Sequence, residues 1–319
     1  MKIHLPNSAF LGNIDPFLRS FDSANSGKLV ITSNKKWISI HPLVLSMVAA
    51  LGLNLSPDKI DFENLEAKSK HYLERMGLFK ILEIKSRIKI KEHEPAGRFI
   101  PLSKIKDSAG LTEFITEMVP LLHLEPKQAE PIRYVVSELV RNVLEHSKAK
   151  DGALVAAQYY KKSNTIRIGI VDTGVGIKET IGKSYHVSDD LEAIRLALMP
   201  GITGTTRLEG GTELNAGAGM FFIKSIAKVN KSFFVVYSGR AMYKLLKSEQ
   251  VKLYADPFKD RHSEDENLPF WQGTAVGIDI SLDDTKKFSA LLDLIRDVYI
   301  QAIRERRKET YKKRRPRFI

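Results

Sequence analysis

The sequence predicts an α/β fold in two parts, a small N-terminal region followed by a larger α/β domain. Two observations lead to this prediction. Short apolar runs with strand character alternate with segments whose apolar residues recur at helical spacing. A polar stretch that begins at Pro95-Ala96-Gly97 then interrupts the pattern and predicts a domain boundary between about residues 95 and 105.

The N-terminal region, residues 1–100, contains both kinds of element. Residues 28–33 and 37–40 are predicted strands, and residues 42–53 are a predicted buried helix. Residues 65–78 have their apolar side chains near one helix face, which predicts an amphipathic helix. This region has no phosphate-loop glycines and no paired acids, so it supplies no candidate site.

The larger domain, residues 105–282, begins with helical patterns and continues with strands. A glycine-punctuated stretch at 182–219 contains one short predicted helix. A last helix begins near residue 285 and runs into a basic tail, so residues 283–319 form a separate C-terminal segment. The predicted helices are 111–123, 128–149 and 189–198, and the predicted strands are 153–160, 165–171, 232–237 and 274–281.

Composition and charge narrow the functional classes. The absence of cysteine among 319 residues excludes disulfides, iron–sulfur clusters and Cys-ligated zinc. The net charge is +12, and residues 304–319 carry much of it. That tail is either a nucleic-acid contact or a solvated extension of the helix before it. The longest apolar stretch, residues 42–53, is shorter than a membrane span, and the N-terminus lacks a signal-peptide core, so a cytoplasmic protein with no membrane contact is expected.

The first chemical motif lies on the helix predicted for residues 128–149. Glu138, Asn142 and His146 are spaced i, i+4, i+8 and therefore share one helix face. An amide oxygen can ligate Mg²⁺, a hard cation that prefers oxygen. A carboxylate one turn earlier can act as a general base. The alternative is a solvated polar stripe on an amphipathic helix.

The second motif follows the strand predicted for residues 165–171. Asp172-Thr173-Gly174-Val175-Gly176 places a carboxylate at a strand end and two glycines where the backbone must turn. Such a carboxylate can accept a hydrogen bond from an exocyclic amine such as adenine N6. An ordinary strand-to-loop turn is the alternative reading. No Walker A sequence occurs, so the P-loop route to ATP is absent.

The third motif is the glycine-rich loop at residues 210–219, which leads into a helix that begins near Met220. Helix N-termini present unpaired N–H groups and a positive dipole end, so they bind phosphates. A dinucleotide-binding G-x-G-x-x-G reading fails here, because no predicted strand feeds this loop within a compact βαβ unit.

Together these segments resemble the N, G1 and G2 boxes of the GHKL superfamily of ATPases, the fold of gyrase, heat-shock chaperone, histidine kinase and mismatch-repair ATPases. Gly273-Thr274, which opens a late strand, looks like the last box of that family. The resemblance covers about residues 105–282. It implies an α/β sandwich with helices on one face of a mixed sheet, with ATP and Mg²⁺ as cofactors.

The resemblance also implies roles for individual residues, beside Glu138, which is the candidate general base by its position one turn before Asn142. Thr203 and Gly204 fall in the segment that would be the ATP lid, whose glycines and hydroxyls suit a loop that closes on nucleotide. The other implied roles are Mg²⁺ binding by Asn142, adenine binding by Asp172, pocket shaping by Gly174 and Gly176, phosphate contact by Gly217, Gly219 and the neighbouring Met220, and a place for Thr274 in the adenine water network.

Three functions fit the resemblance. The first is a Mg²⁺-dependent ATPase that acts as a nucleotide-controlled switch of self-association or partner association, for example as a homodimer. The second is a serine/threonine protein kinase of the anti-sigma-factor type. The third is a nucleic-acid-associated ATPase that uses residues 304–319. A self-contained histidine kinase is disfavoured, because only His93 is followed by an acid, and Pro95 makes that segment a turn.

The N-terminal region is similar, more weakly, to the STAS-like regions that precede such ATPases in some bacterial proteins. Residues 71–79, His-Tyr-Leu-Glu-Arg-Met-Gly-Leu-Phe, carry this likeness. It implies a small α/β domain over residues 1–100.

Overall fold

The computed structural model describes residues 1–21, 27–36, 38–63, 65, 70–86, 99–204, 218–283 and 288–313. In the last of these segments, side chains are described as far as Lys308. Some features predicted from the sequence fall outside the described residues. These are Gly217 with the glycine-rich loop before it, the turn at His93, and the end of the basic tail at residues 314–319.

Residues 1–86, called here the N-terminal module, contain strands β1 (Lys2–Leu5), β2 (Ser8–Ala9), β3 (Leu29–Ser33), β4 (Ser39–Ile40) and β5 (Ile60–Glu63). The helices are α1 (Asp15–Leu18), α2 (Pro42–Gly52), α3 (Lys70–Arg75) and α4 (Leu78–Ile81). Strands β1, β3 and β5 form a parallel sheet in the order β1-β3-β5. Alternate residues of β3 are buried, because successive side chains of a strand point to opposite faces.

A second, larger sheet follows the N-terminal module. Its strands are β6 (Phe99–Ile105), β7 (Ala153–Tyr160), β8 (Thr165–Asp172), β9 (Phe234–Gly239), β10 (Ala241–Leu245), β11 (His262–Asp265) and β12 (Trp271–Ser281). The seven strands are ordered β11-β10-β9-β12-β8-β7-β6. Each neighbouring pair is antiparallel.

The mixed sheet that the resemblance implied is therefore wrong for these strands. β8 and β9 run in the same direction, but β12 lies between them and pairs antiparallel with both. The long connection from β8 to β9 thus produces no parallel neighbours. The strand that decides this comes late in the chain, so the local pattern around β8 and β9 gives no sign of it.

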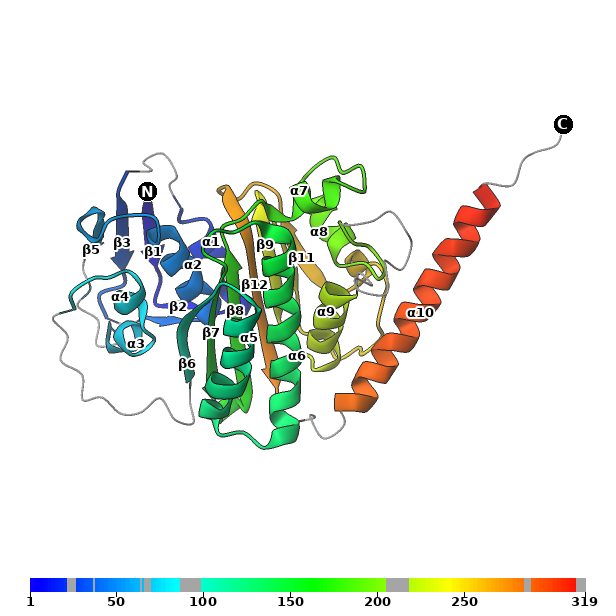
Figure 1. Ribbon diagram of the computed structural model, residues 1–319, viewed down its shortest axis with the longest axis horizontal. Coiled ribbons are helices and arrows are strands. Elements are labelled where there is room, and N and C mark those ends of the chain that lie inside the picture. Colours follow the sequence, from blue (N-terminus) through cyan, green and yellow to red (C-terminus); the bar gives the residue numbers. More distant parts are fainter. Residues whose placement is uncertain are drawn as a thin grey trace.

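Helices α5 (Ser108–Glu113), α6 (Pro126–Asn142), α7 (Gly176–Gly182), α8 (Asp190–Ala197), α9 (Gly219–Val229) and α10 (Phe288–Lys313) follow or separate these strands. Their buried side chains share one hydrophobic core with one face of the seven-stranded sheet. In Figure 1, α9 and α10 lie to the right of this sheet and the N-terminal module lies to its left.

Helix α6 forms because local signals and burial agree. Pro126 occupies the first turn, and Glu125 and Gln128 form a capping box. Most of its buried residues recur every three or four positions, as on the core-facing side of an amphipathic helix: Ala129, Ile132, Val135, Val136, Leu139 and Val140. A π-helical turn, Val143–Ser147, continues the helix, and Lys148 with φ of 55° ends it. The polar face of α6 is left to border the candidate site.

The opposite face of the seven-stranded sheet is covered by α2 of the N-terminal module, while the helices of the larger domain pack on one face, as the resemblance implied. α2 is buried almost throughout and packs on β7, β8 and β12. Gly169 of β8 permits this approach, since a Cβ there would lie 2.2 Å from the backbone nitrogen of Leu43. The N-terminal module and this face of the sheet share one core.

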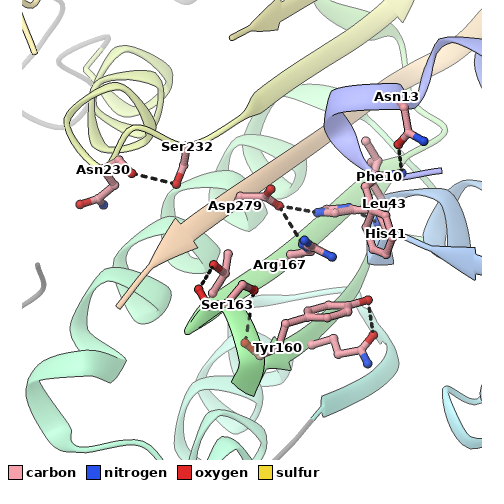
Figure 2. A network of polar contacts seen from close by, with 12 residues as sticks. Phe10, Asn13, His41, Leu43, Tyr160, Ser163, Arg167, Asn230, Ser232 and Asp279 are labelled. Atoms are coloured by element: carbon pink, nitrogen blue, oxygen red, sulfur yellow. Dashed lines mark hydrogen bonds and ion pairs between the residues drawn. The ribbon is translucent and has the colours of Figure 1, made fainter. Parts of the chain in front are cut away.

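A buried polar network joins the start of α2 to the seven-stranded sheet (Figure 2). The backbone N–H of Leu43 donates to Nδ1 of His41 at 3.0 Å, and Nε2 of His41 lies 3.1 Å from Oδ1 of Asp279. Nε of Arg167 lies 3.6 Å from the same carboxylate oxygen. The guanidinium of Arg167 sits 4.1 Å from the ring centre of Phe10 and 4.0 Å from that of Tyr160.

Many of the elements predicted from the sequence are present. The predictions for β7, β8, α2 and α8 agree with the structure to within two residues at each end, and residues 128–147 are helical throughout. The predicted helix at 111–123 is broken into α5, a π-helical turn at Phe114–Met118 and a 3-10 turn at Val119–Leu122. Within the described part of the chain, no helix combines the length and apolar character needed to cross a bilayer.

Candidate nucleotide site

A cavity of about 390 Å³ opens between α6, α7, the start of α9 and the ends of β8 and β12. Most of the site residues predicted from the sequence line it, although they come from segments far apart in the chain. From the predicted set these are Glu138, Asn142, Asp172, Gly176, Thr203, Gly204, Gly219, Met220 and Thr274. Gly174 is not part of the lining, and Gly217 lies outside the described residues.

Asp172 is the last residue of β8 and pairs with Thr274 of β12. Its side chain is 3% exposed, and its Oδ1 accepts a hydrogen bond of 2.7 Å from the backbone N–H of Gly174. Burial raises the pKa of this carboxyl to about 6, against the opposing effect of the backbone N–H groups of Gly174 and Thr274. Asp172 is thus a buried carboxylate that faces a cavity, a position in which it can accept a ligand donor.

Close packing fixes the turn after β8, which requires glycine. A Cβ on Gly174 would lie 2.0 Å from the carbonyl oxygen of Ser147, and this same oxygen accepts a 2.7 Å hydrogen bond from Val175 N–H. Gly176 has a φ of 82°, which favours glycine. Gly174 therefore acts on the site indirectly, by letting the turn pack against the end of the α6 extension.

Ser238, which no sequence motif indicated, holds the same turn through hydrogen bonds. Ser238 in β9 donates its hydroxyl to the carbonyl of Gly273 at 2.7 Å and accepts from Ile177 N–H at 3.0 Å. Gly273 itself has a φ of 94° and comes so close to Asp172 that a Cβ would lie 2.3 Å from the Asp172 carbonyl. The backbone around Asp172 is consequently held from three strands.

Glu138 and Asn142 lie on the polar face of α6, opposite the first residue of α9. A Cβ on Gly219 would lie 2.8 Å from Oε2 of Glu138 and 3.6 Å from Nδ2 of Asn142. Burial raises the pKa of Glu138, while Arg141 acts in the opposite direction and Glu145 adds to the rise. The polar stripe predicted from i, i+4 spacing thus faces the N-terminal end of α9, where N–H groups have no intrahelical acceptors.

The predicted lid residues Thr203 and Gly204 pack against α7. Thr203 is buried, and the carbonyl of Gly204 accepts a 3.0 Å hydrogen bond from the hydroxyl of Ser184. A Cβ on Gly204 would lie 2.3 Å from the carbonyl oxygen of Thr180. These contacts tie the described start of the predicted lid to the cavity wall.

Several other residues line the cavity. Tyr134 lies one helical turn before Glu138, so the spacing that identified Glu138 and Asn142 could have found it. Ile177, Thr180 and Ile181 lie on α7, a helix that the glycine-flanked sequence did not predict. The rest are Leu139, Arg141, Val143, Glu145, His146, Ser147, Ile170, Ala197, Ile202, Ala218 and Val276.

The donor set fits Mg²⁺ only in company with a phosphate ligand. Among the described residues, no group of three or more His, Cys, Asp or Glu side chains is arranged to hold a metal ion. Mg²⁺ typically keeps several waters and takes one or two protein oxygens together with substrate phosphates. The amide of Asn142, between Glu138 and the N-terminal end of α9, suits that mode of binding.

No protein-family model matches the sequence, and no curated protein is significantly similar to it. The interpretation of the cavity rests on its geometry and on the motifs that line it.

Proposed function

We propose that the protein binds ATP with Mg²⁺ in this cavity, as a GHKL-class ATPase that acts as a nucleotide-controlled switch. One observation carries the proposal. The segments that resemble the separate boxes of that class, at Glu138–Asn142, Asp172–Gly176, Gly219 and Thr274, border a single cavity. Its volume of about 390 Å³ falls in the range of about 300–1,000 Å³ typical of small-molecule sites.

The base of the nucleotide is assigned to the end of the cavity beside Asp172. Ile170, Ile177 and Val276 supply apolar walls there, and Asp172 supplies the acceptor. An exocyclic amine that donates to this carboxylate replaces the water lost on burial, which favours the ionised form. This pairing of apolar walls with one buried acceptor suits adenine.

The phosphates are assigned to the other end, between α6 and α9. The first N–H groups of α9 point toward this end, and the helix dipole favours negative charge there. Asn142 supplies one oxygen to a Mg²⁺ ion that the phosphates also ligate. Glu138, held at a raised pKa by burial, is placed to accept a proton from an attacking water or hydroxyl.

Calorimetry of ATP binding with and without Mg²⁺ tests the proposal on the full chain. We expect adenine nucleotides to bind, Mg²⁺ to increase the affinity, and guanine nucleotides to bind less tightly. A phosphate-release assay without any added protein then separates self-contained hydrolysis from phosphotransfer to a serine or threonine of a partner. Absence of ATP binding by folded protein contradicts the whole proposal.

A further inference from the structure

Helix α10 leaves the body of the protein at its C-terminal end (Figure 1) and has two different faces there. Arg304, Arg307 and Lys308 are exposed, and their i, i+3, i+4 spacing places them on one face. Glu305, the acid among them, is hydrogen-bonded by Gln301 at 3.0 Å. The exposed face therefore carries three cations, with one exposed acid, Glu305, beside them.

The other face of α10 anchors the helix to the nucleotide-binding part. Ile295 and Ile303 are buried, and the ring of Tyr299 lies 6.3 Å from that of Phe221 and 5.9 Å from that of Phe222. Phe221 and Phe222 belong to α9, whose first residues line the cavity. The cations are thus carried on a helix whose position is fixed.

We propose that Arg304, Arg307 and Lys308 form a nucleic-acid-binding surface. Guanidinium and ammonium groups in a fixed row bind successive phosphates along a nucleic-acid backbone. The surface does not suit a membrane. An interfacial helix requires an apolar face that runs alongside its cationic face. The exposed large apolar residues that α10 carries in the described region, Leu294 and Ile300, instead precede the three cations in the chain.

A separate contact links this surface to the nucleotide cavity. Nη1 of Arg306 donates a 2.9 Å hydrogen bond to the carbonyl of Pro200. Pro200 lies directly before the segment that contributes Ile202, Thr203 and Gly204 to the cavity wall. This second step rests on the proposed function: nucleotide in the cavity and nucleic acid on α10 change each other's affinity through the Arg306–Pro200 contact.

The surface is tested first, without nucleotide. Fluorescence anisotropy measures binding of the full chain to mixed-sequence duplex DNA and to single-stranded RNA over a salt series. Replacing Arg304, Arg307 and Lys308 with Gln should weaken binding and reduce the slope of log K against log salt by about 2–3, since each phosphate contact contributes about 0.9. A matched triple variant, with Lys59, Lys161 and Lys162 replaced by Gln, removes the same charge from exposed positions elsewhere and should bind like wild type.

If the two triple variants lose binding equally, the effect comes from net charge alone and the assignment is overturned. An unchanged salt slope in the α10 variant overturns it too. Binding to vesicles of phosphatidylcholine with phosphatidylserine is measured as well, to test a membrane as the alternative partner. Binding to vesicles but not to either nucleic acid, lost in the α10 variant, also overturns it.

The coupling is tested by measuring ATP affinity with and without saturating DNA. We expect a change of at least about fivefold in wild type and none in Arg306→Gln, with DNA binding by that variant retained. An unchanged ATP affinity in wild type contradicts the coupling. If the protein does not bind ATP, the proposed function is contradicted. The DNA measurement without nucleotide still tests the α10 surface, because it does not depend on ATP.

Discussion

Nε2 of His41 lies 3.1 Å from Oδ1 of Asp279, and this contact joins the N-terminal module to the central strand β12. Both side chains are buried, with 0% and 7% of their surface exposed. Because Nδ1 of His41 accepts from Leu43 N–H, the proton of the neutral ring resides on Nε2 and is donated to Asp279. Burial lowers the pKa of His41; Asp279 opposes this effect and Arg167 adds to it.

Substitution of His41 should destabilise the whole chain. His41→Ala removes both the cap of α2 and the donor to Asp279, for a loss of about 2–4 kcal/mol in unfolding free energy. His41→Asn keeps a capping oxygen but does not reach Asp279, so its loss should be smaller. Urea unfolding measures both; equal stability of His41→Ala and wild type would show that the contact contributes nothing.

The same histidine should make stability depend on pH. Its folded pKa is lowered, so the unfolded chain binds more protons, and stability falls as the pH drops below about 6.5, the ordinary pKa of histidine. Thermal melts between pH 7 and pH 5 should show a steeper fall in wild type than in His41→Asn. Parallel curves for the two proteins contradict the assignment.

Asp172→Asn should separate stability from binding. The folded pKa of Asp172 is raised from 3.8 to about 6, so its burial lowers stability as the pH rises through that interval. Removing the charge should therefore stabilise the nucleotide-free protein at pH 7 by about 1–3 kcal/mol. Adenine nucleotide affinity should fall about 10- to 100-fold, because the neutral amide oxygen is a weaker acceptor for the adenine amine than the carboxylate it replaces.

The pH dependence of ATP binding provides the control for Asp172. Adenine recognition needs the ionised carboxylate, so wild-type affinity should decline as the pH falls through about 6, whereas Asp172→Asn should lack that step. Undiminished ATP affinity in folded Asp172→Asn, measured by calorimetry, rules out the adenine contact.

Asn142→Ala should reduce the enhancement of ATP binding by Mg²⁺ on the order of tenfold, because one oxygen ligand is lost. Asn142→Asp retains an oxygen and is the matched control. Titrations of ATP at zero and saturating Mg²⁺ supply the comparison. Full Mg²⁺ dependence in Asn142→Ala means that the metal takes its protein ligand elsewhere.

Glu138→Gln should lower phosphate release or phosphotransfer by ~10²–10⁴-fold while ATP binding survives, since a general base acts on the attacking oxygen. The raised pKa of Glu138 indicates that a neutral amide at this position is tolerated by the fold. Thermal stability, ATP affinity and turnover are measured on the same variant. A loss of turnover that only follows a loss of folded protein removes Glu138 from the mechanism.

Several residues that line the cavity could be predicted because they belong to local sequence patterns. Asp172 ends an apolar strand, and Glu138 and Asn142 share a helix face by spacing alone. Ser238 has no such signature, because its position at the site comes from long-range packing. Helix α7 was not predicted either, because the glycines at its two ends, Gly176 and Gly182, are typical of loops.

The sheet was harder to predict for related reasons. Strand β6 lies within the boundary predicted for residues 95–105, and it accommodates Pro101 at an irregularity in its pairing with β7 between Ile100 and Ser103. The apolar pattern of residues 42–53 predicted a buried helix, and α2 is one. The pattern could not show which elements pack against this helix, because a helix that is apolar on all sides can be buried in any hydrophobic core.

The close approach of α2 to Gly169 has a consequence for protein engineering. A fragment that begins at residue 99 would present an uncovered apolar surface on β7, β8 and β9, which includes Leu154, Val171 and Val235. Such an exposed apolar sheet surface promotes aggregation. Expression of this fragment alone, or a chimera with a foreign N-terminal domain, therefore requires redesign of these outward side chains to polar residues.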